Sequence, residues 1–464
     1  MVTSHLDDNR SAIAGMLTEL RQVFGSGRTA SLNWRCDQLH GIELLCKDNE
    51  PEIAAALAND LDRSATEAWL GDIASTAAEA VYARRNLKNW VKPQRQGLPL
   101  AQRPGRAWVQ YDPVGVALII GPWNYPFYLN LAPLVGAAAA GNCAVVKPSE
   151  LAPASSALLA RLLPQYLDHD AFRVVEGDAQ TTQSLLAQGF DHAFFTGGTE
   201  VGKKIMTAAA STLTPVTLEL GGKSPAIITA DADLDVAARR IAAAKLANSG
   251  QMCIAPDYVL AERSIFDQFV AKLVATIATF RSGNADPSLR IVNSTHFNRL
   301  TAMLKDTRGR ITHGGGYDVD RMRIEPTVII GPPADDVVMA DEIFGPILPV
   351  LAIESPDGAV EFVNARPKPL ALYVFTASST RARSLINRIP SGGAVINHVA
   401  MHCLVPQLPF GGVGASGMGA YHGRWGFEAF SHRRAVLAKR TRPDPKLAYP
   451  PYTERALKIM RRVF

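Results

Sequence analysis

Cysteine is scarce in this sequence of 464 residues, and the few cysteines that occur are scattered along it. No Cys-x-x-Cys pair exists, which argues against a zinc site, and we predict no bound metal. An odd number of dispersed cysteines also makes a poor disulfide framework, so the sequence favours a reducing, cytoplasmic setting. The five are Cys36, Cys46, Cys143, Cys253 and Cys403.

The chain also lacks a signal peptide and a long apolar run. Residues 1–28 carry early acids and a helical period instead of a positive start followed by an apolar core. The longest apolar stretch, Leu131–Val146, is interrupted by Pro133 and falls short of the ~20 residues that a membrane-spanning helix needs. We therefore expect a soluble protein.

No excess of one charge sign points to nucleic acid, because the net charge of +5 arises from interleaved basic and acidic residues. The exception is the tail. Residues 439–464 hold eight Lys or Arg side chains against Asp444 and Glu454, and end in an amphipathic run, Thr453–Phe464. Such a tail suits weak contact with an anionic membrane surface, or docking on the chain itself or a partner subunit, and both remain open.

A composition of 47% hydrophobic and 20% charged residues is that of a globular protein, and this length predicts two or three domains. Residues 1–90 predict helices and carry no chemical signal, so we interpret them as scaffold. The next segment, 92–106, is rich in Pro, Gln, Arg and Gly and predicts a loop or an exposed hairpin arm.

Strand–helix alternation begins at Val114 and predicts a doubly wound α/β fold. Val114–Ile120 is a continuous apolar run, typical of a strand buried on both faces of a parallel sheet. Further short apolar runs alternate with helical runs, and a second α/β block starts near Pro215. Ligands of such sheets bind at the carboxyl ends of strands, where this sequence places its unusual polar residues.

One of these strand ends is the glycine turn Phe195–Lys203. Gly197, Gly198, Thr199 and Gly202 follow a strand and open a helix, which would direct backbone N–H groups at a pyrophosphate. The turn is not a GxGxxG fingerprint, so an ordinary tight turn is the alternative.

A second strand end carries Lys147 and Glu150, which suit the hydroxyls of a ribose. The alternative is a helix start capped by Ser149.

Two further polar residues stand alone in apolar or constrained surroundings. Glu219 ends an apolar strand beside Gly221, and predicts either a general base or a buried salt bridge. Asn124 lies in the Trp-Asn-Tyr-Pro turn, where an amide can donate to an oxyanion or simply bond the local backbone.

The candidate nucleophile is Cys253, in the turn Asn248–Pro256 that follows the helical run Val236–Ala247. A thiolate needs a polar, partly open setting, which this turn allows. A lone cysteine is more often buried structure, but the accompanying carboxylate, amide and glycine turn favour chemistry.

Taken together, these residues make the chain resemble the aldehyde dehydrogenase family, and the resemblance covers nearly its whole length. The matching motifs are Gly121–Pro126, Lys147–Glu150, Phe195–Gly202, Leu218–Pro225, Asn248–Cys253, Glu342–Pro346 and Pro409–Gly419. Several stretches resemble the class 3 branch, which acts on fatty and aromatic aldehydes with NAD or NADP: Thr214–Pro225, Ala255–Tyr258, Pro369–Tyr373 and Tyr421–Arg434.

The resemblance implies a Rossmann-type cofactor domain, a second α/β catalytic domain and a small bridging arm. The implied limits are 1–90 with 107–220 for the NAD(P)-binding domain, 221–396 for the catalytic domain, 91–106 with 397–440 for bridging segments, and 441–464 for the basic tail. It further implies a homodimer, a small aldehyde as substrate and no nucleic-acid partner.

The resemblance also implies residue roles. Cys253 attacks the aldehyde, the Asn124 amide and the Cys253 N–H hold the oxyanion, and Glu219 activates water to hydrolyse a thioester. In the class 3 branch Glu342 competes for the role of base. The implied cofactor contacts are Trp123, Lys147, Glu150, Gly197, Gly198, Thr199, Gly202, Leu220, Glu342 and Phe344.

The sequence departs from the family pattern at few positions. Gly198 stands where many relatives carry Ser or Asn, and Met252 where several relatives have Thr. We expect His398, Met401, His402 and Cys403 to shape a tunnel for a medium- or long-chain or aromatic aldehyde. NAD and NADP are not distinguished, although Glu150 would repel a 2′-phosphate if it pointed inward.

Three rival functions remain at the level of sequence: a redox-free cysteine acyltransferase or esterase, a CoA-acylating dehydrogenase, and a non-catalytic relative. The dinucleotide-like turn argues against the first and Glu219 against the second. Intact Cys253, Asn124 and Glu219 argue against the third.

Overall fold

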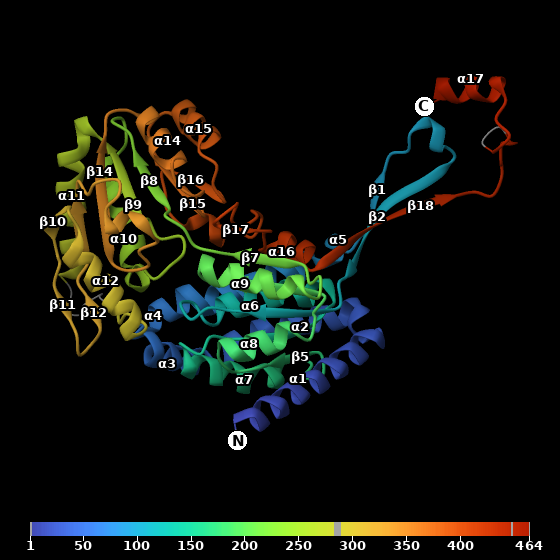
Figure 1. Cartoon of the computed structure of the whole chain (residues 1–464), viewed down its shortest axis with the longest axis horizontal. Helices are drawn as coiled ribbons and strands as arrows, with labels where there is room; N and C mark the ends of the chain where they lie inside the picture. Colours follow the sequence, from blue (N-terminus) through green and yellow to red (C-terminus); the bar gives the residue numbers. More distant parts are fainter. Residues whose placement is uncertain (1, 283–288, 447–448, 464) are drawn as a thin grey trace.

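The computed structural model describes residues 2–282, 289–446 and 449–463. Two α/β lobes lie side by side, and a narrow arm projects away from the first of them (Figure 1). The first lobe contains the N-terminal helices and a six-stranded sheet, and the second contains a seven-stranded sheet. The predicted two-lobed α/β class with an arm is confirmed.

Helices occupy residues 1–90 of the first lobe, as the sequence predicts. Their apolar faces pack onto the core, and Ser31 and Ser64 cap two of them. The helices are α1 (Val2–Gly25), α2 (Leu32–Asp48), α3 (Glu50–Leu61), α4 (Ala65–Ala68) and α5 (Ala74–Trp90), with a π-helical turn η2 (Trp69–Ile73) between the last two.

The first sheet has the order β17-β7-β6-β3-β4-β5 and is parallel except for β17. Its strands are β3 (Val116–Ile120), β4 (Cys143–Lys147), β5 (Phe172–Val174), β6 (His192–Thr196), β7 (Val216–Glu219) and β17 (Gly417–Met418). The accompanying helices are α6 (Tyr128–Ala140), α7 (Pro153–Tyr166), α8 (Ala179–Leu186) and α9 (Thr199–Ala210). β3 and β4 are buried throughout, which explains their unbroken apolar sequences.

The second sheet has the order β10-β13-β14-β9-β8-β15-β16. Its strands are β8 (Pro225–Ile228), β9 (Tyr258–Glu262), β10 (Arg310–His313), β13 (Thr327–Ile330), β14 (Ile347–Ile353), β15 (Ala371–Phe375) and β16 (Gly393–Ile396). Its helices are α10 (Leu234–Leu246), α11 (Phe266–Arg281), α12 (Ser294–Asp306), α13 (Val337–Ala340), α14 (Pro356–Asn364) and α15 (Ser379–Arg388), beside the hairpin β11 (Tyr317–Asp318) and β12 (Arg323–Ile324). The sequence did not predict β10, β16 or this hairpin, whose residues are largely exposed or half-buried.

The arm is a three-stranded antiparallel sheet in the order β1-β2-β18. It consists of β1 (Gln94–Gln96), β2 (Gly105–Pro113) and β18 (Ser431–Lys439). The domain boundary that the sequence placed between residues 106 and 107 therefore falls inside β2, a strand of the arm. Within the segment 397–440, β17 joins the first sheet and α16 (Gly423–Ala429) packs on α6, so only β18 lies in the arm.

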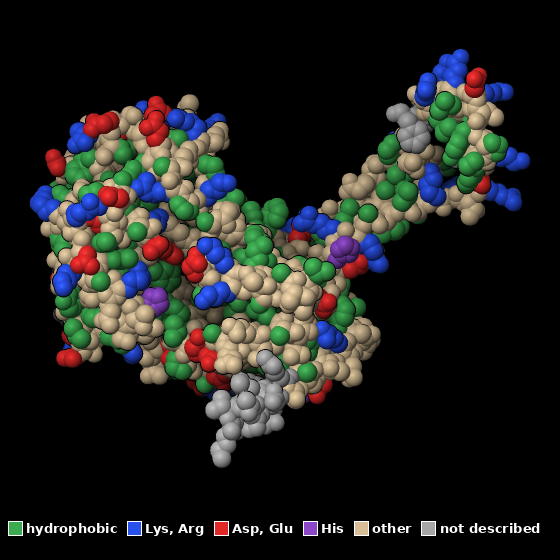
Figure 2. All heavy atoms as spheres, in the orientation of Figure 1, with side chains coloured by type: hydrophobic (Ala, Val, Ile, Leu, Met, Phe, Trp, Pro, Cys, Tyr) green, Lys and Arg blue, Asp and Glu red, His purple; other side chains and the backbone are tan. Residues whose placement is uncertain are grey.

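The tail returns to the arm and ends in helix α17 (Glu454–Val463) at its tip (Figure 1). There it contacts the short helix η3 (Leu100–Gln102). Basic side chains gather around this tip (Figure 2). Phe464, the last residue of the predicted amphipathic run, lies outside the described residues. Within those residues, the chain has no helix with the length and apolar character that crossing a bilayer requires.

Candidate active site

Two cavities meet at Cys253. One, of about 910 Å³, lies along the carboxyl ends of the first sheet, and the other, of about 560 Å³, adjoins it at this thiol. Cys253, Asn124 and Glu219 line both cavities. The structure therefore brings together the three residues for which the sequence predicted catalytic roles.

The turn that carries Cys253 is strongly constrained. Asn248 and Ser249 both have a left-handed backbone with φ of 50°, which is costly for residues other than glycine. Gly250 continues the turn at φ 71°, where a Cβ would collide with the carbonyl oxygen of Gly345. The Ser249 hydroxyl fixes the turn by donating to the Leu289 carbonyl at 3.0 Å and accepting from its N–H at 2.7 Å. The thiol is thus held at a defined place.

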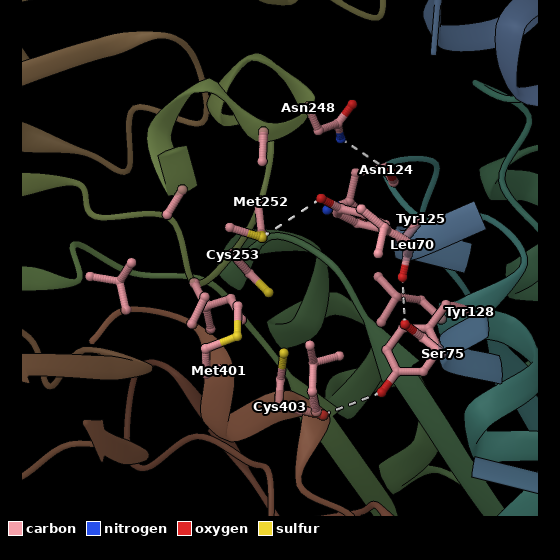
Figure 3. A pocket seen from close by; sticks show the side chains of 18 of the residues that line it. Leu70, Ser75, Asn124, Tyr125, Tyr128, Asn248, Met252, Cys253, Met401 and Cys403 are labelled. Carbon is pink, nitrogen blue, oxygen red and sulfur yellow. Dashed lines mark hydrogen bonds between the residues drawn. The ribbon is translucent and has the colours of Figure 1, made fainter. Parts of the chain in front are cut away.

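Asn124 is bonded to this turn across a large sequence separation. Its Nδ2 donates to the Gln251 carbonyl at 3.1 Å, and Asn248 Nδ2 donates to the carbonyls of Asn124 at 3.1 Å and Gln251 at 3.0 Å. Purely local backbone bonding, the alternative for Asn124, is not what the structure shows. A side-chain amide carries two N–H groups, so the second is available to a bound oxygen. Asn124, Cys253 and their neighbours face the smaller cavity (Figure 3).

Glu219 ends β7 and is 2% exposed. Neither carboxylate oxygen has a hydrogen-bond partner in the described part of the chain, and no cation pairs with it there, so the predicted alternative of a buried salt bridge is wrong. Burial raises the pKa of this carboxyl well above its ordinary value, because the charged form is poorly solvated. Such a carboxylate is a stronger base than an exposed one.

The surroundings of Cys253 disfavour the thiolate form of its side chain. Burial raises the pKa of this thiol, and the neighbouring acidic groups of Glu342, Cys403 and Glu219 raise it further. Formation of the thiolate therefore requires a proton acceptor in the site.

The larger cavity has a lining that suits a dinucleotide. Trp123, Lys147, Glu150, Gly197, Gly198, Glu342 and Phe344 line it. Gly197 admits no side chain, since a Cβ would lie 2.5 Å from the Phe195 ring, and α9 opens directly after this turn without a side-chain cap from Gly198. These residues fit the pyrophosphate and riboses of NAD or NADP.

Three predicted cofactor residues do not line this cavity. Thr199 donates its hydroxyl to the Ala415 carbonyl at 3.3 Å, and Gly202 is buried where a Cβ would meet Leu220 at 2.6 Å. Leu220 lines the smaller cavity instead.

At the end of β4, Lys147 pairs with Glu150 at 2.9 Å. The Ser149 hydroxyl accepts from the Leu151 N–H and does not cap α7, which was the alternative for this segment.

The loop with Glu342 and Phe344 closes the larger cavity near the thiol. Burial, assisted by the Asp257 charge and opposed by the hydrogen bond from the Gly222 N–H, raises the pKa of Glu342 to about 8. Phe344 stacks edge-on against Trp123 with ring centroids 5.5 Å apart. Both predicted residues therefore face the cavity from the second lobe.

The smaller cavity is mainly apolar. Its lining includes Leu70, Tyr125, Tyr128, Leu129, Met252, His398, Val399, Met401, Cys403 and Phe410. Cys253 and Cys403 point into it from opposite sides (Figure 3). His402, which the sequence placed in the tunnel, does not line it, because its ring packs against Gly393 and lies 5.5 Å from the Phe410 ring.

Comparison with known proteins fits this geometry. Residues 7–436 match the model of the aldehyde dehydrogenase family. The chain belongs to the aldehyde dehydrogenase family. Aldehyde dehydrogenase family 3 member A2 of Mus musculus is 47% identical over 440 residues, which cover 94% of this chain and 90% of that relative. The dimeric NADP-preferring aldehyde dehydrogenase of Rattus norvegicus is 42% identical over 446 residues, 95% of this chain and 98% of the relative.

A solved structure of Staphylococcus aureus AldH in a substrate-bound state is 40% identical, with a TM-score of 0.93 over 97% of this chain and 98% of that one. The fold is that of an aldehyde dehydrogenase, and the activity of this dehydrogenase is NAD(P)-dependent oxidation of an aldehyde. The family resemblance drawn from the sequence is confirmed.

Sequence reasoning missed several residues of this dehydrogenase that support the site. Arg299 on α12 donates to the carbonyls of Glu342 at 3.3 Å and Ile343 at 2.7 Å, and so fixes the loop above Cys253. Arg63 and Asp72 reach the site from the N-terminal helices, so the interpretation of residues 1–90 as scaffold alone is wrong. None of these residues lies in a local motif, so only their contacts in the folded chain reveal them.

Proposed function

We propose that this dehydrogenase oxidises medium- or long-chain aliphatic or aromatic aldehydes to acids through a thioester on Cys253. The observation that carries the proposal is the position of the thiol between two different cavities. One is lined by residues suited to a dinucleotide, and the other is mainly apolar. The aldehyde carbon can therefore reach the thiol from one side and the cofactor from the other.

The roles of the residues follow from their places. Cys253 Sγ attacks the aldehyde carbon as its proton passes to a carboxylate, and the free N–H of Asn124 with the Cys253 backbone N–H stabilises the oxyanion. When bound, NAD or NADP would accept the hydride. Loss of that hydride leaves an acyl thioester on Cys253, and Glu219 removes a proton from the water that hydrolyses it.

Glu219 is the better placed of the two candidate bases. It lines both cavities, and its carboxylate oxygens have no hydrogen-bond partner within the described residues. Glu342 lines only the larger cavity and accepts from the Gly222 N–H. We therefore assign hydrolysis to Glu219 and contact with the nicotinamide ribose to Glu342.

Both cofactors are included in the proposal. The Lys147–Glu150 pair lies where the adenine ribose would bind, and the Glu150 carboxylate disfavours a 2′-phosphate only while it points toward it. The half-exposed side chain of Glu150 can turn toward solvent, and a rat relative is named NADP-preferring.

A panel of aldehydes tests the substrate class. With NAD or NADP, decanal, hexanal and benzaldehyde are expected to exceed acetaldehyde in kcat/KM, because each buried CH₂ contributes ~0.8 kcal/mol in an apolar site. Reduction of NAD(P) is followed by absorbance for each substrate. Highest kcat/KM with acetaldehyde would reject the apolar-substrate proposal, and no reduction with any aldehyde would reject the catalytic one.

We propose that the arm forms a homodimer. β18 is the outer strand of the arm sheet and is mostly exposed, so its free edge is suited to pairing with a second copy. We expect a dimer by light scattering, and Leu437→Asp, on this strand, to shift it toward monomer. An unchanged dimer in Leu437→Asp, or a monomeric wild type, would contradict this assembly.

We also propose that the tail makes weak contact with anionic membrane surfaces while the protein itself is cytoplasmic. α17 carries Arg455, Lys458, Arg461 and Arg462, and exposes Leu457 and Ile459. Co-sedimentation with vesicles containing phosphatidylserine is expected, and should fall as salt is added. Equal binding to neutral vesicles, or none to either, would leave docking on the arm as the role of α17.

A further inference from the structure

The guanidinium of Arg63 links the two turns that form the active site. Its side chain is 1% exposed and lies immediately after α3. Nη2 donates to the Asn124 carbonyl, and Nε donates to Asn248 Oδ1 at 3.3 Å. The guanidinium also lies over the Tyr125 ring, 4.1 Å from its centroid. A single side chain thus contacts the oxyanion turn and the nucleophile turn together.

Asp72 fixes Arg63 and the oxyanion turn from the other side. This carboxylate is fully buried and accepts from Arg63 Nη1 at 2.5 Å through Oδ2. Its Oδ1 accepts from the backbone N–H groups of Phe127 and Tyr128, each at 2.9 Å, where α6 begins. The oxyanion turn is therefore held at its start by Arg63 and at its end by Asp72.

The backbone around Asp72 departs from the α-helix at this point. Residues Trp69–Ile73 form a π-helical turn, which inserts an extra residue into the helical path and is frequent at functional sites. Gly71 in this turn lies so close to Tyr125 that a Cβ would meet its ring at 2.7 Å. The turn thereby brings the backbone and Asp72 against the loop that carries Asn124.

These contacts complete a closed set of hydrogen bonds around the reacting groups. The Asn124 carbonyl accepts from Arg63 and from Asn248, while the Gln251 carbonyl accepts from Asn248 and from the Asn124 amide. Gln251 precedes the nucleophile by two positions. Displacement of Arg63 would therefore change the distance between the Asn124 amide and Cys253.

We propose that Arg63, held by Asp72, is a positioning residue that sets the oxyanion donor against the nucleophile. The inference rests on the proposed roles of Cys253 and Asn124. A buried ion pair is weak evidence for a contribution to stability, since apolar residues often replace such a pair without loss. Its contacts instead converge on the reacting groups, where misplacement by about 1 Å can lower the rate ~10²-fold.

The test compares Arg63→Met, Asn124→Ala and the double variant. Arg63→Met is expected to lower kcat ~10²-fold, with KM for aldehyde and affinity for NAD changed less than ~3-fold, because only positioning is lost. In the Asn124→Ala background the same change should lower kcat by less than ~5-fold, since Arg63 acts through Asn124. The Arg63→Lys variant, which keeps the ion pair, should recover part of the kcat.

Arg35→Met is the matched control. Arg35 is also a buried arginine of the N-terminal helices and donates to the carbonyls of Thr29 at 3.1 Å and Ala139 at 3.4 Å, away from both cavities. It is expected to lower the melting temperature while kcat stays within ~2-fold of wild type, because its contacts are structural.

Two results would overturn the proposal: wild-type kcat in folded Arg63→Met, or losses that multiply fully with Asn124→Ala. If Arg63→Met does not fold, Arg63→Lys takes its place, with an expected loss of ~10-fold that is again non-additive with Asn124→Ala. Full activity of Cys253→Ala would instead reject the proposed function, so the two failures are distinguishable.

Discussion

Cys253→Ala is expected to lower kcat for aldehyde oxidation by roughly 10⁴–10⁶-fold, the range found when a covalent nucleophile is removed. The loss should lie in the chemical step, because the thiol is only one of the many side chains that line the large cavity, which we assign to the cofactor. Affinity for NAD, measured by fluorescence titration, should therefore stay within ~2-fold of wild type.

Cys36→Ala provides the control for this substitution. Cys36 is a half-buried free cysteine on α2 and lines neither cavity. Its replacement should leave kcat close to wild type, which separates the role of Cys253 from a general sensitivity to loss of a thiol. Substantial NAD(P) reduction by folded Cys253→Ala would remove the thioester mechanism.

Glu219→Gln is expected to lower steady-state kcat by ~10²–10⁴-fold, the usual effect of removing a general base. Because burial raises the pKa of Glu219, its basic form increases with pH only above the ordinary range of a carboxyl group. In wild type, kcat should rise with pH through this higher range. Glutamine is neutral at every pH, so the variant should lose that rise.

Glu342→Gln is the comparison that identifies the base. The pKa of Glu342 is also raised, to about 8, so a rise of kcat with pH does not by itself name the residue. If the rise survives in Glu342→Gln and disappears in Glu219→Gln, Glu219 is the base. The opposite pattern would transfer the role to Glu342.

The sequence predicts those parts of this molecule whose physical causes are local. β3 and β4 are buried on both faces, so their residues are continuously apolar and easily recognised. Cys253, Asn124 and Glu219 stand out because each is a reactive or polar residue at the end of an apolar element or in a constrained turn. Family motifs then supply their roles and the identity of the cofactor.

The contacts that hold the site depend on the folded chain. Arg63 lies just after α3 and Asp72 in the π-helical turn, and the groups that they contact, on Asn124, Asn248 and Tyr128, follow far along the sequence. Thr199 follows the glycines of its turn, as a phosphate-binding residue would, yet its hydroxyl bonds Ala415 outside the cofactor cavity. Motif position alone therefore does not tell which side of a turn a side chain occupies.

The most direct test of the account is the mass of the enzyme during turnover. Glu219→Gln is mixed with decanal and NAD, quenched in acid and digested, and the peptide that contains Cys253 is weighed. Because hydrolysis is slowed, we predict an adduct on Cys253 with the mass of decanal less two hydrogen atoms, formed together with NADH. NADH formation with Cys253 unmodified, or the adduct on Cys403, would contradict the account.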